Sequence, residues 1–509
     1  MKNIVKFVLP LLLVIAIPII LFMQKEENDL QKIDRISEKV FKEFHPTGLS
    51  VLVVKDNKII YEESFGYKNS NTVDFLNNND IFNIASCTKA FTAAAIGKLV
   101  DDGLVNWNDK VIDYIPEFKL SDKYITQNVE IRDILSHRTG LGTFYGDLLW
   151  YNTDYSNKDV INRMQYLPII YDFRTNLGYQ NNMYMIAGEI IERVSGKSWE
   201  SFIQQKFFTP LEMKSSRTSN YQFDGTEEIA FPHYNDSTIN YYDFNAGKPA
   251  ASIWSNVRDL ANWTMMLLND GKWKNEQILS SETVRNLTSA QTIRYVSEEK
   301  ESFGIHFRNY ALGWNTYDYN GRKIIEHNGG MPGYISKVSI IPEENLGIII
   351  LNNGFELYGN NAIFYSIIDI ITDQFTNDWI NYYLSKKLES ESDEREFEKE
   401  RITSKNPDSK PTLALQKYAG KYHDKMYGDA LVKFENNKLT LTLLPAKLIF
   451  TGVLEHWSEN TFKVQFKDPF LPFGLIQFEL NESENIIGFK IDLPSGDFHF
   501  QNLDFKKIN

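Results

Sequence analysis

Residues 82–103 read FNIASCTKAFTAAAIGKLVDDG, and this stretch carries both a helix pattern and a chemical pattern. Apolar residues recur at helical spacing through the middle of the stretch, and the Asp-Asp-Gly at 101–103 predicts its end. Ser86 and Lys89 stand three residues apart where this helix begins, so they share one face of its first turn. Free serine is unreactive near neutral pH and needs a base, and a lysine in apolar surroundings, which disfavour its charge, can act as one. The pair predicts a serine nucleophile with a lysine base.

Taken alone, each motif of this kind is weak. Ser-x-x-Lys also occurs at residues 297–300, but that copy lies in a polar stretch with no apolar helix behind it. His-x-Gly occurs once, within EHNGGMPG. Acyl transfer also needs two backbone N–H donors for an oxyanion, and a helix start and a glycine-rich strand edge can each offer one. Tyr-x-Asn occurs four times, beginning at Tyr67, Tyr155, Tyr179 and Tyr358.

The order and surroundings of these motifs carry more information. The chain resembles the serine β-lactamase and penicillin-binding-protein superfamily, in the branch of class C β-lactamases, D-Ala-D-Ala carboxypeptidases and related esterases. That branch uses Tyr-x-Asn as its second motif and often His-x-Gly as its third. ILSHRTGL, FRTNLGYQNNMYMIAGEIIERVSGKSW and YALGW followed by HNGGMPGY resemble family landmarks in family order. The resemblance covers roughly residues 29–380, and it selects Tyr179, which follows Phe-Arg-Thr and precedes an apolar helix.

The resemblance implies a role for each catalytic group. Ser86 would attack a carbonyl and form an acyl-enzyme, and Lys89 would accept its proton or tune the neighbouring tyrosine. Tyr179 would act as general base or acid, and Asn181 would hold Lys89 and touch substrate amide groups. Water would complete the reaction, so the resemblance implies neither a metal nor a cofactor.

The third motif supplies the remaining substrate and oxyanion residues, which are His327, Asn328, Gly329 and Gly330. The N–H groups of Ser86 and Gly330 would form the oxyanion hole. His327 stands where penicillin-specific relatives carry lysine, and histidine is neutral much of the time near pH 7. Strong binding of a penicillin carboxylate is therefore not expected, which favours a peptidase or an esterase over a β-lactamase. Arg174 is expected to pack and hydrogen-bond behind the catalytic tyrosine.

Composition sets wider limits. The chain has 509 residues, 42% of them hydrophobic, which supports two or more packed domains. Its net charge of −13 argues against nucleic acid as a partner. Cys87 is the single cysteine, so no internal disulfide and no cysteine-based zinc site is possible, and we interpret it as a small helix residue.

Residues 1–24 form a basic start followed by an apolar run, which indicates a signal peptide or a membrane anchor. The run ends in bulky residues with no small-x-small cleavage site, so we favour an uncleaved anchor. The basic flank predicts that the rest of the protein lies outside the cytoplasm, at the cell surface or in a periplasm.

The rest of the chain divides into three parts. Residues 25–388 are expected to form an α+β hydrolase domain: a helix at 29–44, a hairpin turning at Asp56-Asn57, a helical middle, late strands and a helix near 361–384. The two ends of the domain would build an antiparallel sheet. Residues 389–411 indicate a solvated helix end and a charged linker. Residues 412–509 predict a small all-β barrel, which resembles the lipocalin-like barrel of some peptidases of this family.

Three functions remain open from the sequence. The favoured one is an extracytoplasmic serine peptidase acting on small or D-amino-acid-containing peptides. An esterase or weak β-lactamase uses the same chemistry. A protein that binds penicillins or peptidoglycan fragments without catalysis is the alternative from another class. In barrel-bearing relatives the barrel can cap the cleft and support homo-oligomers, but it can also be a simple spacer.

Overall fold

The computed structural model describes residues 27–242, 246–375 and 377–508. The predicted membrane or signal segment at residues 1–24 lies outside them. Within the described ranges, no helix combines the length and the apolar character needed to cross a bilayer.

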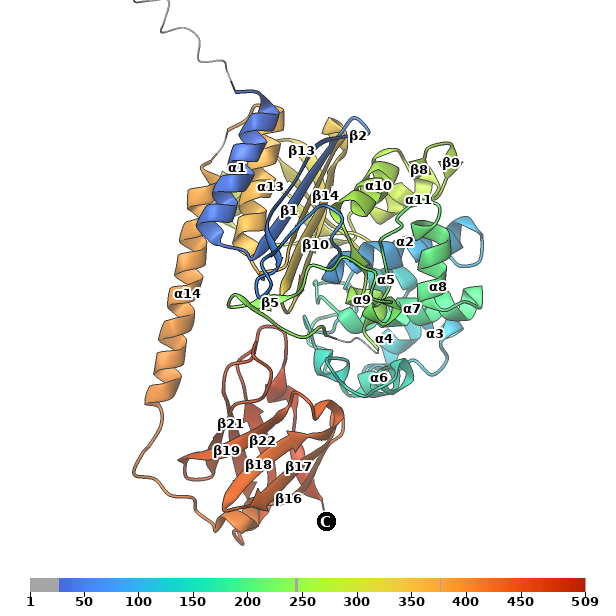
Figure 1. The fold of residues 1–509 in the computed structure, drawn as a ribbon. Coiled ribbons are helices and arrows are strands. Elements are labelled where there is room, and N and C mark those ends of the chain that lie inside the picture. The colour runs from blue at the N-terminus through green and yellow to red at the C-terminus, as the bar shows by residue number, and fades with distance from the viewer. Residues whose placement is uncertain (1–26, 243–245, 376, 509) are drawn as a thin grey trace, which may run out of the picture.

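A nine-stranded antiparallel sheet forms the centre of the larger domain, in the order β10-β11-β12-β13-β14-β15-β1-β2-β3 (Figure 1). The two ends of the domain meet where β1 pairs with β15, with Val51 opposite Ile350. This confirms the predicted α+β sheet. Asp56 and Asn57 both have positive φ, as a tight hairpin turn between two strands requires. The strands are β1 (Gly48–Lys55), β2 (Lys58–Asn69), β3 (Asp74–Phe75), β10 (Thr292–Arg294), β11 (Arg308–Tyr310), β12 (Asn315–Tyr319), β13 (Arg322–Met331), β14 (Tyr334–Ile341) and β15 (Leu346–Asn352).

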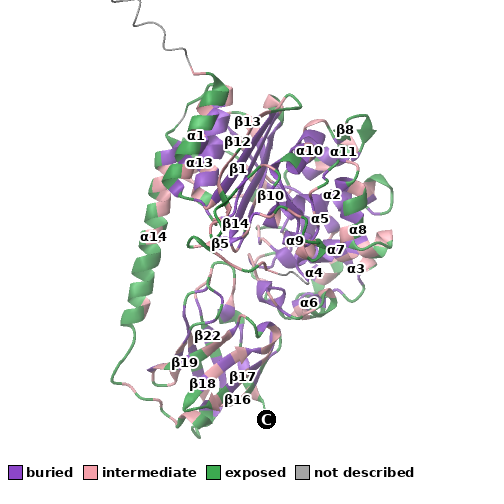
Figure 2. Ribbon diagram, viewed as in Figure 1, coloured by how far each residue is buried: buried purple, intermediate pink, exposed green. Residues whose placement is uncertain are grey.

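Both faces of the sheet are covered, and its central strands are buried (Figure 2). One face packs against α1 (Asp29–Phe44) and α13 (Leu357–Thr372), whose apolar residues form one core with alternate residues of β1 and β15. The other face packs against a helical lobe with its own core. The helices of that lobe include α2 (Thr88–Asp101), α3 (Val111–Tyr114), α4 (Lys123–Asn128), α5 (Ile131–Leu135), α6 (Asn157–Arg163), α7 (Asn181–Ser195), α8 (Trp199–Ile203), α9 (Lys248–Ala251), α10 (Val257–Leu268) and α11 (Ser281–Leu287).

Helix α2 lies at the centre of this lobe and is buried on nearly every side. Its run of small residues lets neighbouring helices approach closely: a Cβ on Gly97 would lie 2.5 Å from the Thr283 methyl group of α11. The preceding strand β4 (Phe82–Asn83) pairs with β7 (Trp254–Ser255). The segment that leads into α2 is therefore held by β7.

The predicted single helix at 361–384 is wrong. Helix α13 ends at Thr372, and the next residue, Asp373, adopts the left-handed conformation. A second helix, α14 (Trp379–Thr403), starts after Asp378, whose side chain caps it.

The charged segment 389–411 is helical as far as Thr403. Glu, Lys and Arg favour helices and can pair along a helix surface. Figure 1 shows α14 running along one side of the molecule towards the barrel.

The C-terminal part forms a closed barrel of eight strands, as predicted. Aromatic residues, among them Tyr422, Phe478 and Phe489, fill its interior. The strands are β16 (Gly420–Asp424), β17 (Gly428–Glu435), β18 (Lys438–Leu443), β19 (Thr451–Ser458), β20 (Thr461–Val464), β21 (Gly474–Leu480), β22 (Ile486–Asp492) and β23 (Phe505–Ile508).

The barrel packs against the helical lobe through specific hydrogen bonds. Tyr151 donates to Asp468 Oδ2 at 2.8 Å, and Arg163 donates to the Met426 carbonyl at 2.8 Å. The core of the helical lobe continues into the barrel without a break. The barrel is thus packed firmly against the helical lobe.

Candidate active site

Ser86 lies in a single 3-10 turn, Ala85–Cys87, immediately before α2. Ala85 adopts φ +46, a conformation that costs free energy for a non-glycine residue, and its N–H donates to Asn83 Oδ1 at 2.7 Å. The hydroxyl of Ser86 faces a cleft while the neighbouring side chains are buried. Cys87 is buried and free, and burial raises the pKa of its thiol to about 12.

Lys89 is fully buried, one helical turn after Ser86. Its Nζ contacts three oxygens: Ser86 Oγ at 3.0 Å, Asn181 Oδ1 at 2.6 Å and the Ala250 carbonyl at 3.0 Å. Burial lowers the pKa of Lys89 to about 7, although the nearby Asp147 carboxylate opposes this shift. The apolar setting expected from the sequence is present. Near neutral pH a large fraction of this amine is unprotonated and able to accept a proton.

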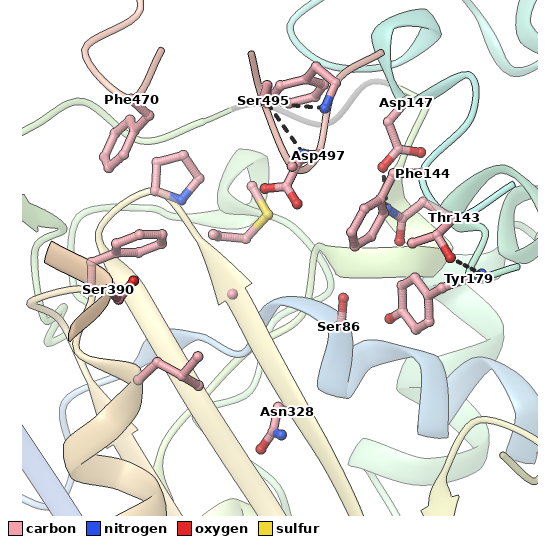
Figure 3. A pocket seen from close by; sticks show the side chains of 18 of the residues that line it. Ser86, Thr143, Phe144, Asp147, Tyr179, Asn328, Ser390, Phe470, Ser495 and Asp497 are labelled. Atoms are coloured by element: carbon pink, nitrogen blue, oxygen red, sulfur yellow. Dashed lines mark hydrogen bonds between the residues drawn. The ribbon is translucent and has the colours of Figure 1, made fainter. Parts of the chain in front are cut away.

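Tyr179 lies beside Ser86 in the same cleft (Figure 3). The Lys89 Nζ is 4.9 Å from the centre of its ring. Burial raises the pKa of the Tyr179 phenol well above 10, and the hydrogen bond with Ser86 offsets only part of that shift. The backbone of Tyr179 is fixed by bonds with Thr143 Oγ1 and the Phe144 N–H, at 3.1 and 2.8 Å. The phenol is therefore neutral at rest, which suits a proton donor.

Asn181 begins α7 and connects Lys89 to an aspartate that the sequence analysis missed. Asn181 Nδ2 donates to Asp147 Oδ2 at 2.6 Å, and Trp150 Nε1 donates to Asp147 Oδ1 at 3.1 Å. Because the carboxylate accepts from the amide nitrogen, the amide oxygen must face Lys89. Burial raises the pKa of Asp147 to about 7. The one signal for Asp147 in the sequence is that it is a charged residue within the apolar run FYGDLLWY.

His327 lies on β13 and is buried. Its Nδ1 faces the Asn328 carbonyl at 2.7 Å, so Nδ1 carries the proton, and Nε2 accepts from the Tyr310 hydroxyl at 2.9 Å. Burial lowers the pKa of His327 to about 3. The neutral ring expected from the sequence is present. Tyr310, from YALGW, is a further residue that the sequence analysis did not assign.

His137, from ILSHRTGL, packs against Tyr179. Its ring centre lies 4.3 Å from that of Tyr179, and its Nδ1 accepts from the Gln180 N–H at 3.0 Å. Arg174 makes ion pairs with Asp133 at 2.7 Å and Glu130 at 2.8 Å.

The glycines of the third motif allow β13 to lie directly against the turn that carries Ser86. A Cβ on Gly329 would be 2.2 Å from the Ile84 carbonyl oxygen and 3.0 Å from the Ala85 Cβ. Gly330 lines the same cleft as Ser86. Asn328 also lines it, and its Oδ1 is buried without a hydrogen-bond partner among the described residues.

Gly329→Ala is expected to displace this turn, because a backbone oxygen 2.2 Å away cannot rotate aside. We expect a loss of roughly 1–3 kcal/mol in unfolding free energy and at least about a ten-fold slower acylation. Gly330→Ala is the matched control and should cost less, because its nearest neighbour would be Ile335 Cδ1 at 3.5 Å. Thermal melts and labelling rates with a fluorophosphonate probe measure both effects. Equal losses in the two variants would contradict this interpretation.

The cleft has a volume of about 1780 Å³ and is shared by the hydrolase domain, α14 and the barrel. Barrel residues Phe470, Ser495 and Asp497 face Ser86 across it (Figure 3). The barrel loop is fixed to the lobe by His499 Nε2, which lies 2.8 Å from the Thr143 carbonyl. The barrel therefore forms part of the cleft that leads to Ser86.

Comparisons with known proteins agree with this arrangement. Residues 36–363 match the family model described as "Beta-lactamase", and residues 404–507 match a "Domain of unknown function (DUF3471)". Unguisins hydrolase ungD' from Aspergillus campestris is 29% identical over 470 residues, which cover 85% of this chain and 84% of that protein.

Two solved structures share the fold. The octameric penicillin-binding protein homologue from Pyrococcus abyssi superposes with a TM-score of 0.61 at 21% identity, covering 94% of this chain and 100% of that one. The D-amino acid amidase from Ochrobactrum anthropi SV3, complexed with L-phenylalanine amide, superposes with a TM-score of 0.54 at 18% identity, covering 67% and 99%.

Proposed function

Because the chain belongs to the Beta-lactamase family, we propose that it is a serine peptidase that forms an acyl-enzyme on Ser86 and acts on small peptides, including peptides with D-amino acids. The observation that carries this proposal is the 3.0 Å contact between Ser86 Oγ and Lys89 Nζ. A lysine with a pKa of about 7 can remove the serine proton at neutral pH.

The mechanism follows from the protonation states. Neutral Lys89 accepts the Ser86 proton while the serine oxygen attacks the substrate carbonyl. The N–H groups of Ser86 and Gly330 stabilise the oxyanion. Neutral Tyr179 gives its proton to the leaving nitrogen as the C–N bond breaks, and the Lys89 ammonium returns a proton to the phenolate. Water then attacks the acyl-enzyme, and the same two groups accept and deliver its protons.

Several observations support a peptide substrate. The neutral His327 offers no charge to a penicillin carboxylate. The barrel loop restricts the cleft, which favours small substrates over folded proteins. Among similar proteins, one is named an unguisins hydrolase and another a D-amino acid amidase, and a further solved structure is that of SurE with D-Leu.

The proposal extends to location and assembly. Residues 1–24 would anchor the enzyme to a membrane, with the hydrolase domain and barrel outside the cytoplasm. An octameric structure has been described for the Pyrococcus abyssi homologue, which supports a homo-oligomer.

A labelling experiment tests the nucleophile. A fluorophosphonate probe should modify the wild-type protein. Ser86→Ala should remove the labelling completely, because Ser86 carries the one hydroxyl that contacts Lys89 Nζ among the residues that the structure describes. Labelling that persists in Ser86→Ala would refute the assignment. D-Ala-terminated peptides, p-nitrophenyl esters and a chromogenic cephalosporin then separate a peptidase from an esterase or β-lactamase. A stable adduct without turnover on any of them would indicate a binding protein.

A further inference from the structure

Three aromatic side chains from distant parts of the chain meet where the barrel borders the cleft. They are Tyr234 of β5 (His233–Tyr234), Phe355 in the loop after β15, and Phe470 of the barrel. All three line the cleft that contains Ser86. The ring centre of Phe470 lies 4.3 Å from that of Tyr234 and 5.6 Å from that of Phe355. Tyr234, Phe355 and Phe470 form the aromatic cluster.

Phe470 is fixed by the contact between the barrel and the helical lobe. Its N–H donates to Asp468 Oδ1 at 2.9 Å, and Oδ2 of the same carboxylate accepts from the Tyr151 hydroxyl. In the same loop, Gln465 Nε2 donates to the Leu471 carbonyl at 3.0 Å. The carboxylate that joins the two domains therefore also holds the backbone of Phe470 in place.

Phe355 adopts a backbone conformation that is costly for its residue type. Its φ is +57, in the left-handed region, where a bulky side chain is an outlier. The next residue is tied to Asn352, since the Glu356 N–H donates to Asn352 Oδ1 at 3.2 Å and Asn352 Nδ2 donates to the Glu356 carbonyl at 2.7 Å. The Phe355 side chain is still 43% exposed, so burial offsets little of this cost. Glycine adopts such a φ readily, and what phenylalanine adds here is an aromatic ring at the cleft.

The aromatic cluster lies at the end of the cleft away from the leaving group. Tyr179 would protonate the leaving nitrogen, and its ring centre is 6.2 Å from that of His327 on β13. The strand continues past the oxyanion donor Gly330 to Met331, which is roughly 13 Å beyond His327 at the usual rise per residue. Figure 3 shows Tyr179 and Phe470 on opposite sides of Ser86.

The turn after β13 leads to the aromatic cluster. A Cβ on Gly333 would lie 2.9 Å from the His233 nitrogen, so this turn packs against the residue that precedes Tyr234. The His233 N–H donates to the Asn353 carbonyl at 3.0 Å, which joins the same segment to the loop that carries Phe355. A substrate whose carbonyl occupies the oxyanion hole would therefore extend its acyl side towards the aromatic cluster.

We propose that the aromatic cluster binds a large apolar side chain, above all an aromatic one, on the residue that precedes the acylated residue of the substrate. Aromatic rings attract each other in edge-to-face and offset arrangements, in addition to the gain from apolar burial. This inference rests on the proposed function and makes it narrower, because it specifies the acyl side of the peptide. It also gives the barrel a part in substrate selection, in place of the spacer role that the sequence leaves open.

Two anilides that differ only in one ring provide the test. N-(3-phenylpropanoyl)-D-alanyl p-nitroanilide places a phenyl group where the side chain of the preceding residue would be, and N-propanoyl-D-alanyl p-nitroanilide lacks it. Both are uncharged and release the same p-nitroaniline, which is followed by its absorbance. The wild-type protein should favour the phenylpropanoyl compound in kcat/KM by roughly 10- to 100-fold, the range expected for burying such a ring. Sodium sulfate should maintain or increase this ratio, because it strengthens apolar burial.

Phe470→Ala and Phe355→Gly should each lower the ratio by roughly 3- to 10-fold, while kcat/KM on the propanoyl compound changes little. Phe355→Gly is the sharper variant, because glycine tolerates the positive φ and the protein should fold normally, as a thermal melt would show. Phe307→Ala is the matched control, since Phe307 is a 70% exposed phenylalanine of the hydrolase domain outside the cleft, and it should keep the wild-type ratio.

A wild-type ratio near one, or a ratio that survives in the Phe355→Gly/Phe470→Ala double variant, would overturn the inference. Failure of the proposed function looks different: neither anilide would be hydrolysed by the wild type faster than by Ser86→Ala.

Discussion

Lys89→Met is expected to abolish acylation of Ser86 while the protein still folds. The methionine side chain can fill the buried space between α2 and α7, but it cannot accept the serine proton. Loss of a general base costs roughly 10²- to 10⁴-fold in rate. The measurement is the rate of fluorophosphonate labelling, with a thermal melt of the same sample. Normal labelling in this variant would exclude Lys89 as the base.

The same variant should change the response to pH. Acylation by the wild type should rise as pH increases through about 7, because Lys89 loses its proton there. Its folded pKa is lower than that of the unfolded chain, so between about pH 7 and 10.5 the unfolded state binds more protons and this part of the stability increases with pH. Lys89→Met should lose both the increase of the acylation rate with pH and the increase of stability with pH. The variant leaves two buried acceptors unpaired, Asn181 Oδ1 and the Ala250 carbonyl, and each should lower the free energy of unfolding by about 1–3 kcal/mol. Removal of the buried amine offsets part of this loss.

Tyr179→Phe is expected to separate the two halves of the reaction. The ring would still pack on His137 and Phe144, but no proton could reach the leaving group. Hydrolysis of a peptide, whose amine is a poor leaving group, should fall by roughly 10²- to 10⁴-fold. Acylation by a p-nitrophenyl ester, whose leaving group needs no proton, should fall much less.

Comparing kcat/KM on the two substrate classes checks this. Equal losses on both would mean that Tyr179 acts as the base on Ser86 instead. The raised pKa of its phenol argues against that role, because an anionic tyrosine would need cations close enough to overcome its burial.

The parts of the site that could be predicted from the sequence are those fixed by local spacing. Ser86 and Lys89 are one turn apart, so the helix alone brings them together. Tyr179 and the third motif required the resemblance to a known family, because nothing in their spacing shows that β13 packs against the start of α2. That packing depends on Gly329, whose missing side chain leaves room for the Ile84 carbonyl.

The residues that were missed depend on long-range contacts. Asp147 belongs to the site because its carboxylate accepts a hydrogen bond from the Asn181 side chain, a contact that the sequence does not show. Tyr310 belongs to the site because its hydroxyl contacts His327 Nε2, which lies on another strand of the sheet. In the fold, the break between α13 and α14 was missed because an apolar helix and a charged one follow each other with no proline or glycine between them. A left-handed Asp373 ends the first helix instead.

The pairing of β1 with β15 has a consequence for how this enzyme matures. These strands lie on either side of the entire helical lobe in the chain. β1 can pair early with β2 in a hairpin, but its other edge has no partner until most of the polypeptide exists. Contacts between such distant segments slow folding, and unpaired strands expose the chain to aggregation meanwhile. For the extracytoplasmic location proposed above, export of an unfolded chain would thus meet little resistance, since the complete sheet assembles only after β15 arrives.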